Sequence, residues 1–183
     1  MPATAETLAA HVLDDVLITF RRQKELVERA LAQVDDADFF RTIDAESNSI
    51  AIIVKHVGGN LRSRWTDFLT VDGEKPDRDR DGEFIVASEA SRAAIMKIWD
   101  DGWTALTNTF STLRPTDLTT TVLVRGEALS AIEAMHRSVA HIAQHAGQVV
   151  LLAKHYRSAD WKTLSIARGA SQQFNATHAA THR

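Results

Sequence analysis

The chain has 183 residues, 44% of them hydrophobic, and a formal charge of −3 at pH 7. This suits one domain with a core of ordinary size. We expect no nucleic-acid or membrane partner, because those surfaces attract proteins with a basic excess or a basic face. No apolar run reaches the roughly 20 residues that cross a bilayer, and the N-terminus does not resemble a signal sequence, so we expect a cytoplasmic protein. Because cysteine is absent, any metal must be bound by nitrogen and oxygen atoms.

Apolar residues recur every three or four positions along four stretches, which predicts four amphipathic helices. The first covers about residues 5–34, and the second runs from an N-cap at Ser47 or Asn48 to residue 71. The third starts near Ser88 and ends before Arg114-Pro115, and the fourth covers about 128–156. The pattern predicts an all-α, four-helix bundle as a single domain over residues 1–183, with the bundle at about 5–157 and an irregular C-terminal tail at 158–183.

Three segments interrupt this pattern. Gly58-Gly59 in the second helix costs roughly 1 kcal/mol per glycine relative to alanine, which indicates either a close approach by another helix or a ligand, or a local kink. Residues 72–83 are charged and contain proline and glycine, and we interpret them as a solvated connecting loop. Residues 119–124 are rich in β-branched residues and predict a short strand or an extended connector before the last long helix. No partner strand is recognisable nearby, so no sheet is expected.

Three histidines predict a metal site. His141 and His145 lie four residues apart and therefore project from the same side of the last helix, and His56 borders the apolar stripe of the second helix. Three nitrogen ligands with a free fourth position are typical of catalytic zinc, and imidazole also binds nickel, iron, manganese or copper. His136 should point elsewhere, and His155 lies about 15 Å along the helix from His145.

Polar residues that follow His56 on the same helix are candidates for binding a substrate. Asn60, Ser63 and Arg64 lie four, seven and eight residues after it, near its face of the helix. Arg64 equally suits a structural ion pair with Asp67 or another acid. The catalytic residues are unassigned, because the sequence shows no serine or cysteine nucleophile motif and no clear general base.

Several motifs give the chain a family resemblance: NSIA (48–51), KHVGGN (55–60), RWTDF (64–68), HAGQ (145–148) and SIARG (165–169). Over about residues 5–170 the chain resembles the DinB/YfiT-like superfamily of four-helix bundles, and more narrowly an uncharacterised bacterial branch of it. Members bind a divalent metal through one histidine of the second helix and two of the last. His56, His141 and His145 match those positions.

The resemblance also implies a function and partners. Characterised members include thiol-dependent S-transferases and a mycothiol-dependent isomerase, in which the metal activates the thiol of a low-molecular-weight cofactor. By analogy, this chain is a divalent-metal-dependent enzyme, zinc or nickel being the first choices, that transfers a thiol to a small electrophilic substrate. The alternatives are a metal-dependent hydrolase, or a non-catalytic helical protein that binds a metal or small ligand. A homodimer is also expected from the resemblance.

Overall fold

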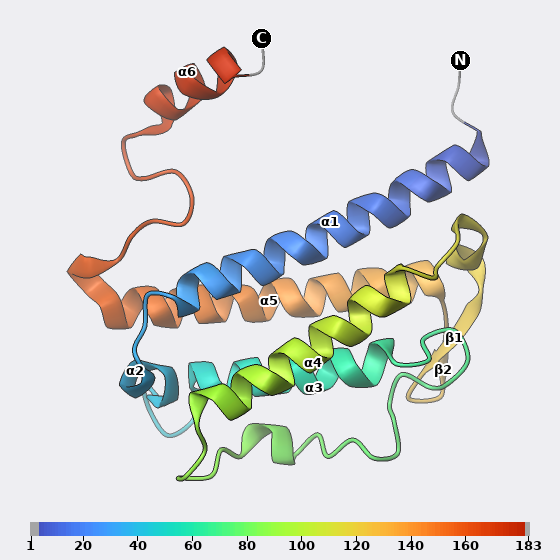
Figure 1. Ribbon diagram of the computed structural model, residues 1–183, viewed down its shortest axis with the longest axis horizontal. Helices are drawn as coiled ribbons and strands as arrows, with labels where there is room; N and C mark the ends of the chain where they lie inside the picture. Colours follow the sequence, from blue (N-terminus) through green and yellow to red (C-terminus); the bar gives the residue numbers. More distant parts are fainter. Residues whose placement is uncertain (1–3, 182–183) are drawn as a thin grey trace.

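The computed structural model describes residues 4–181, and over that range the protein is mostly helical (Figure 1). The four long helices are α1 (Ala5–Leu31), α3 (Ile50–Trp65), α4 (Arg92–Phe110) and α5 (Ala131–Arg157). Two shorter helices are α2 (Asp36–Phe40) and α6 (Ser171–Thr181), and the two strands are β1 (Thr121–Val124) and β2 (Glu127–Ser130). Short 3-10 turns occupy Gly82–Phe84, Pro115–Thr119 and Ser158–Asp160.

The long helices begin where a side chain caps the first free backbone N–H groups. Thr4, Ser49, Ser91 and Ser130 each accept a hydrogen bond from the backbone N–H three residues on, which satisfies a donor that the helix itself leaves unpaired. Helices α3 and α4 therefore start slightly later than the hydrophobic pattern predicts. In the same way, α5 starts at Ala131 instead of 128, which releases residues 127–130 for a strand.

The predicted short strand is confirmed as β1, but the expectation that it has no partner strand nearby is wrong. Strand β1 pairs with β2 in an antiparallel hairpin, with Val124 opposite Glu127. Both turn residues, Arg125 and Gly126, have positive φ angles of 57° and 75°, as the tightest hairpin turns require. Asp72 accepts hydrogen bonds from both of their backbone N–H groups, at 2.8 and 2.7 Å. The turn is thus held by a residue far away in the sequence.

The long helices pack in pairs around an aromatic core. Helix α1 lies along α5 and α3 lies along α4, and α3 also contacts α5 (Figure 1). Phe20 of α1 meets Trp65 of α3 edge-to-face, with ring centroids 5.4 Å apart, and also contacts Trp103 of α4. These rings are buried, so one hydrophobic core joins the helices that carry the candidate site.

Glycines allow α3 and α4 to cross at close range. A Cβ added to Gly58 would lie 2.5 Å from the carbonyl oxygen of Ile98, and one added to Gly102 would lie 2.4 Å from the carbonyl oxygen of Gly58. Both distances are too short for any side chain, because the opposing atoms are backbone. The predicted close approach of another helix at Gly58 is therefore confirmed.

The C-terminal region is more regular than predicted. Residues 158–160 form a 3-10 turn and residues 171–181 form α6, which extends away from the other helices in Figure 1. The described side chains of α6, residues 171–177, are exposed, so this part of the helix shows no buried apolar stripe from which the sequence could have revealed it. The remaining predicted tail residues, 182–183, and residues 1–3 at the other end lie outside the described range. No helix between residues 4 and 181 is long and apolar enough to cross a membrane.

Candidate metal centre and adjoining cavity

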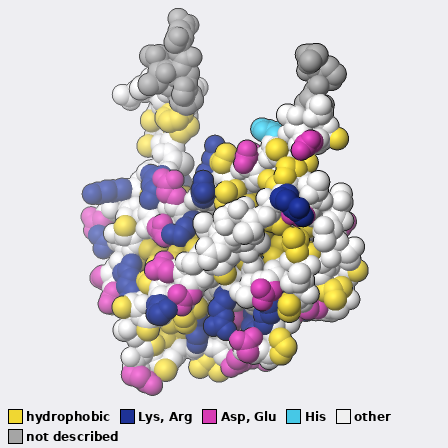
Figure 2. Space-filling view, turned by 45° about the vertical axis from the view of Figure 1, so that its right-hand side comes forward, with side chains coloured by type: hydrophobic (Ala, Val, Ile, Leu, Met, Phe, Trp, Pro, Cys, Tyr) yellow, Lys and Arg dark blue, Asp and Glu magenta, His cyan; other side chains and the backbone are white. Residues whose placement is uncertain are grey.

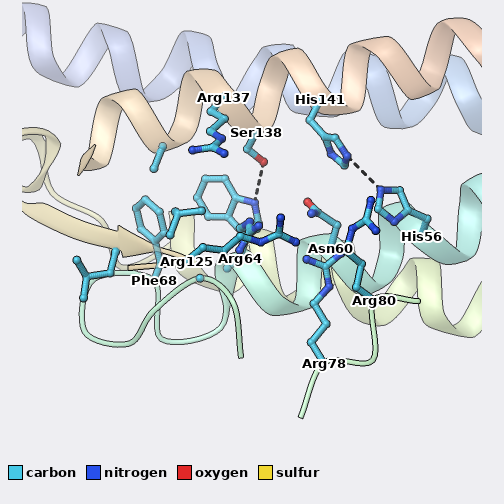
Figure 3. A pocket seen from close by; sticks show the side chains of 15 residues that line it. His56, Asn60, Arg64, Phe68, Arg78, Arg80, Arg125, Arg137, Ser138 and His141 are labelled. Atoms are coloured by element: carbon cyan, nitrogen blue, oxygen red, sulfur yellow. Dashed lines mark hydrogen bonds between the residues drawn. The ribbon is translucent and has the colours of Figure 1, made fainter. Parts of the chain in front are cut away.

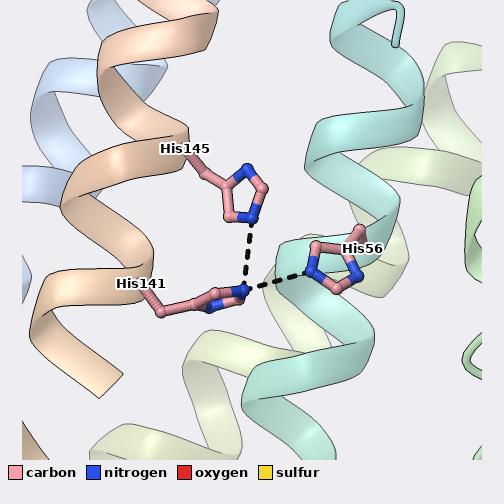
Figure 4. Close-up of side chains that lie close together, drawn as sticks. All are labelled: His56, His141 and His145. Atoms are coloured by element: carbon pink, nitrogen blue, oxygen red, sulfur yellow. Dashed lines mark hydrogen bonds between the residues drawn. The ribbon is translucent and has the colours of Figure 1, made fainter. Parts of the chain in front are cut away.

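The three predicted histidines meet between α3 and α5 (Figure 4). The Nε2 atom of His141 lies 3.1 Å from Nε2 of His56 and 3.2 Å from Nε2 of His145. All three possible ligand atoms lie within 4.8 Å of one another. His56 is buried and the other two are partly buried. The group could therefore hold a metal ion.

The outer nitrogens fix the protonation of two of these rings. Nδ1 of His56 lies 2.8 Å from a carboxylate oxygen of Glu83, and Nδ1 of His145 lies 2.7 Å from the amide oxygen of Gln148. Because both oxygens accept hydrogen bonds, each Nδ1 carries the proton when its ring is neutral, and each Nε2 keeps a free lone pair. Both lone pairs face Nε2 of His141.

This arrangement fits a cation better than a proton. A proton on Nε2 of His141 satisfies at most one of the two lone pairs that face it. The opposite nitrogen of His141, Nδ1, is buried and has no hydrogen-bond partner, and this holds equally for a proton or a cation at Nε2. A divalent cation would satisfy all three Nε2 atoms at once, and the contacts from Glu83 and Gln148 are the kind that orient metal-binding histidines.

The surroundings also keep His141 and His145 neutral. Burial lowers the pKa of His141 from 6.5 to about 4, and repulsion from His145 and His56 adds to the effect. Burial also lowers the pKa of His145, although its hydrogen bond with Gln148 opposes the change. Near pH 7 both rings are therefore in the neutral form that metal binding requires.

Loop 72–83 supplies part of the site, so its interpretation as a solvated connector is wrong. The side chains of Arg78 and Glu83 are only 4% and 9% exposed. Arg78 donates two parallel hydrogen bonds to the Glu83 carboxylate, both at 2.8 Å. Lys55 of α3 fixes the end of the loop by donating to the carbonyl oxygens of Gly82 and Ile85, each at 2.7 Å. The loop thus folds back on α3 and delivers Glu83 to His56.

Glu83 fits because α3 has a glycine beneath it. A Cβ added to Gly59 would lie 2.4 Å from Oε1 of Glu83. Burial alone would raise the pKa of Glu83, but hydrogen bonds from Arg78 and His56 outweigh this effect and hold the pKa below its usual value. Sequence reasoning missed both Glu83 and Arg78, because alternating acids and bases do not show which members turn inward. Gly59 was the one available hint.

A cavity of about 240 Å³ adjoins the histidines (Figure 3). His56 and His141 line it, together with Asn60 and Arg64. Ser63 does not line it: its hydroxyl donates to the carbonyl oxygen of Gly73 at 2.7 Å.

Helical geometry explains why the three predicted substrate-binding residues separate. At about 100° per residue, Asn60 and Arg64 rotate about 40° and 80° from His56 in one direction, whereas Ser63 rotates about 20° in the other. The first direction faces the cavity, and the second faces loop 72–83. Nη1 of Arg64 lies 3.0 Å from a carboxylate oxygen of Glu74, so its acidic neighbour is Glu74, where the sequence suggested Asp67 or another acid.

The other histidines stay away from the group. His11, His136 and His155 are exposed, and none of them belongs to the metal-binding group found among the described residues. His136 and His155 lie elsewhere, as predicted. The side chains of His178 and His182 lie outside the described residues.

The fold and site together define a mostly helical protein with a histidine group that could hold a metal ion. The chain belongs to the DUF1572 family, proteins of unknown function, whose family model matches residues 7–170. The chain matches no curated protein and no solved structure.

Proposed function

We propose that this protein is a divalent-metal-dependent enzyme on a four-helix bundle of the DinB/YfiT-like type, with α1, α3, α4 and α5 as the bundle. His56, His141 and His145 would hold the ion. Zinc or nickel suits these nitrogen ligands, and iron or manganese is also compatible.

One observation carries this proposal: three Nε2 atoms converge at the wall of a cavity. Among the described residues the group contains these three ligands and no fourth, and two of the three histidines, His56 and His141, also line the cavity. A structural site is normally closed by a fourth protein ligand, whereas a catalytic site keeps one position free. The arrangement therefore favours a catalytic role over a purely structural one.

The reaction we propose is transfer of a low-molecular-weight thiol to a small electrophilic substrate. The thiol loses its proton to solvent, its sulfur forms a bond to the electrophilic carbon, and the leaving group departs from that carbon with the electron pair of the broken bond. A divalent ion at this position would supply Lewis-acid chemistry that lowers the pKa of an incoming thiol. The chain has no cysteine, so the thiol must come from a separate molecule.

The protein's own residues would position the ligands and shape the reaction space. Glu83 holds the Nδ1 proton of His56, and Gln148 holds that of His145, so both rings keep a fixed orientation. Trp65 and Phe68 form apolar walls that exclude water, and Asn60 places an amide beside the histidines.

Metal analysis of untagged protein, purified without chelator, tests the first part of the proposal. Wild type should contain about one ion per chain, and His56→Ala and His141→Ala should lose it. His136→Ala is the matched control, because this exposed histidine lies on the same helix as His141. Equal metal content in all three variants would refute the assignment.

Turnover assays test the reaction. Metal-loaded wild type should consume low-molecular-weight thiols in the presence of an electrophile, and His141→Ala should not. If the loaded protein instead hydrolyses esters or amides without a thiol, the hydrolase alternative is correct. If it binds metal but turns over neither class, the transferase proposal fails and a non-catalytic metal-binding role replaces it.

A further inference from the structure

The cavity beside the histidines has a strongly basic wall. Five arginines line it, and no acidic side chain is among its described lining residues (Figure 3). They come from four parts of the chain: α3, loop 72–83, the β1–β2 turn and α5. The five are Arg64, Arg78, Arg80, Arg125 and Arg137. A protein with a net negative charge has thus gathered positive charge around one small space.

Three of these arginines lie at the end of the cavity away from the histidines. Arg64 is eight residues after His56 on α3, and Arg137 is four residues before His141 on α5. At 1.5 Å per residue these separations are about 12 and 6 Å along the helices. Because α3 and α5 run in opposite directions (Figure 1), both arginines are displaced to the same side of the histidines. Arg125 joins them from the hairpin turn.

The carboxylates that pair with these arginines do not line the cavity. Glu74 lies 3.0, 3.0 and 3.4 Å from Arg64, Arg78 and Arg125, and Glu83 bonds to Arg78. Arg80 and Arg137 pair with Asp81 and Glu127, at 3.6 and 2.8 Å. Five guanidinium groups thus share four paired carboxylates, none of which lines the cavity. The divalent ion proposed above would add further positive charge.

Arg64 also has hydrogen-bonding capacity to spare. Its Nη1 atom is buried and has no hydrogen-bond partner, because the Glu74 oxygen 3.0 Å away does not meet hydrogen-bond geometry. Burial lowers the pKa of Arg64, and although Glu74 opposes this change, Arg78 and Arg125 reinforce it. An anion in the cavity would offset the repulsion that Arg64 receives from Arg78 and Arg125.

The side chains that line the cavity suit a ligand that has an oxyanion group attached to a carbon skeleton. Guanidinium groups bind carboxylates and phosphates through paired, charge-assisted hydrogen bonds. Trp65, Phe68 and Leu123 line the same cavity and give apolar contacts for a carbon chain.

We propose that the cavity binds a small organic anion. Its carboxylate or phosphate group is held by Arg64, with Arg125 and Arg137 at the mouth, and its skeleton extends toward the histidines. The identification of this anion as a reactant rests on the proposed function, whereas binding of the anion requires only the arginines.

Calorimetric titration of the chelator-treated full chain tests this binding without metal. The probes are succinate, methyl phosphate and the neutral analogue succinamide. At least one of the two anions should bind, more weakly as salt is added, and the better binder identifies the oxyanion. Succinamide should not bind. Arg64→Gln should weaken anion binding about tenfold or more.

Two further variants separate a binding role from a folding role. Arg137→Gln changes a side chain that is 55% exposed, so the fold should persist while anion binding weakens severalfold. Arg62→Gln is the matched control: it lies on the same helix as Arg64, is 63% exposed and pairs with Asp77, and it should bind as wild type does. Equal binding of succinamide, or unchanged anion binding in both Arg64→Gln and Arg137→Gln, would overturn the proposal.

Metal-loaded protein then shows which reactant carries the anion. Mercaptosuccinate differs from succinate by one thiol group. If it binds more tightly than succinate only when metal is present, the anion and the thiol belong to one molecule. If the two bind equally, the anion and the thiol belong to different molecules.

The same titrations distinguish this proposal from the proposed function. Wild type that a chelator has stripped of metal should still bind succinate, so failure of the metal assignment does not remove the anion site. Anion binding that requires metal and ignores the arginine variants would show that the anion ligates the metal, and the arginine site would then be wrong.

Discussion

Replacing Gly58 by alanine should destabilise the protein, although alanine favours helices. The added Cβ would lie 2.5 Å from the carbonyl oxygen of Ile98, about 0.9 Å short of the 3.4 Å at which ordinary van der Waals contact begins. The opposing atoms are backbone, so no side-chain rotation relieves the contact and α3 must move away from α4. Overpacking of this kind costs about 1–3 kcal/mol, against which helix propensity returns about 1 kcal/mol.

Gly147→Ala is the matched control, because it is the same substitution in a helix without the crossing. Nothing lies within 4 Å of a Cβ added there, and Gly147 is exposed on α5. This variant should gain about 0.5–1 kcal/mol. Urea unfolding followed by circular dichroism measures both free energies of unfolding. A Gly58→Ala protein at least as stable as wild type would refute the argument for the close crossing.

Three further predictions concern the site. Glu83→Gln should lower metal affinity about 10- to 100-fold, because Glu83 orients His56. It should also lower the free energy of unfolding by about 3 kcal/mol, because Arg78 loses its main buried partner. The exposed control, Glu89→Gln, should change neither quantity. The pKa of Glu74 is lowered: burial opposes the shift, but the hydrogen bond from Arg125 and the charges of Arg78 and Arg64 outweigh it. Its carboxylate therefore stabilises the fold above pH 4.5, and this contribution is lost as pH falls through the lowered pKa. Unfolding curves of wild type and Glu74→Gln should thus differ at pH 7 and converge in acid; a difference independent of pH would contradict this assignment. Zinc at 100 times its dissociation constant should raise the free energy of unfolding of chelator-treated wild type by about 2.7 kcal/mol. Calorimetry should show no such increase in His141→Ala.

The helices and the histidine group were accessible from the sequence because both depend on regular spacing. A 3.6-residue period places His141 and His145 on one face of α5, and it places His56 beside the buried stripe of α3. Packing that stripe against α5 brings the three rings together. The pattern failed for α6, because its described side chains, residues 171–177, are exposed and leave no buried period in the sequence.

The tertiary structure alone decided which charged residues belong to the site. Loop 72–83 alternates acids and bases, and only its fold against α3 turns Arg78 and Glu83 inward while Asp77 and Asp81 stay exposed. The same holds for the β1–β2 hairpin, whose turn is held by Asp72, and for Arg64, whose acidic neighbour Glu74 lies in the loop. Spacing along one helix fixes local neighbours, but the free energy of burying a charge depends on partners brought from distant parts of the chain. That dependence is why the sequence indicated the histidine group and the structure was needed to find the basic cavity beside it.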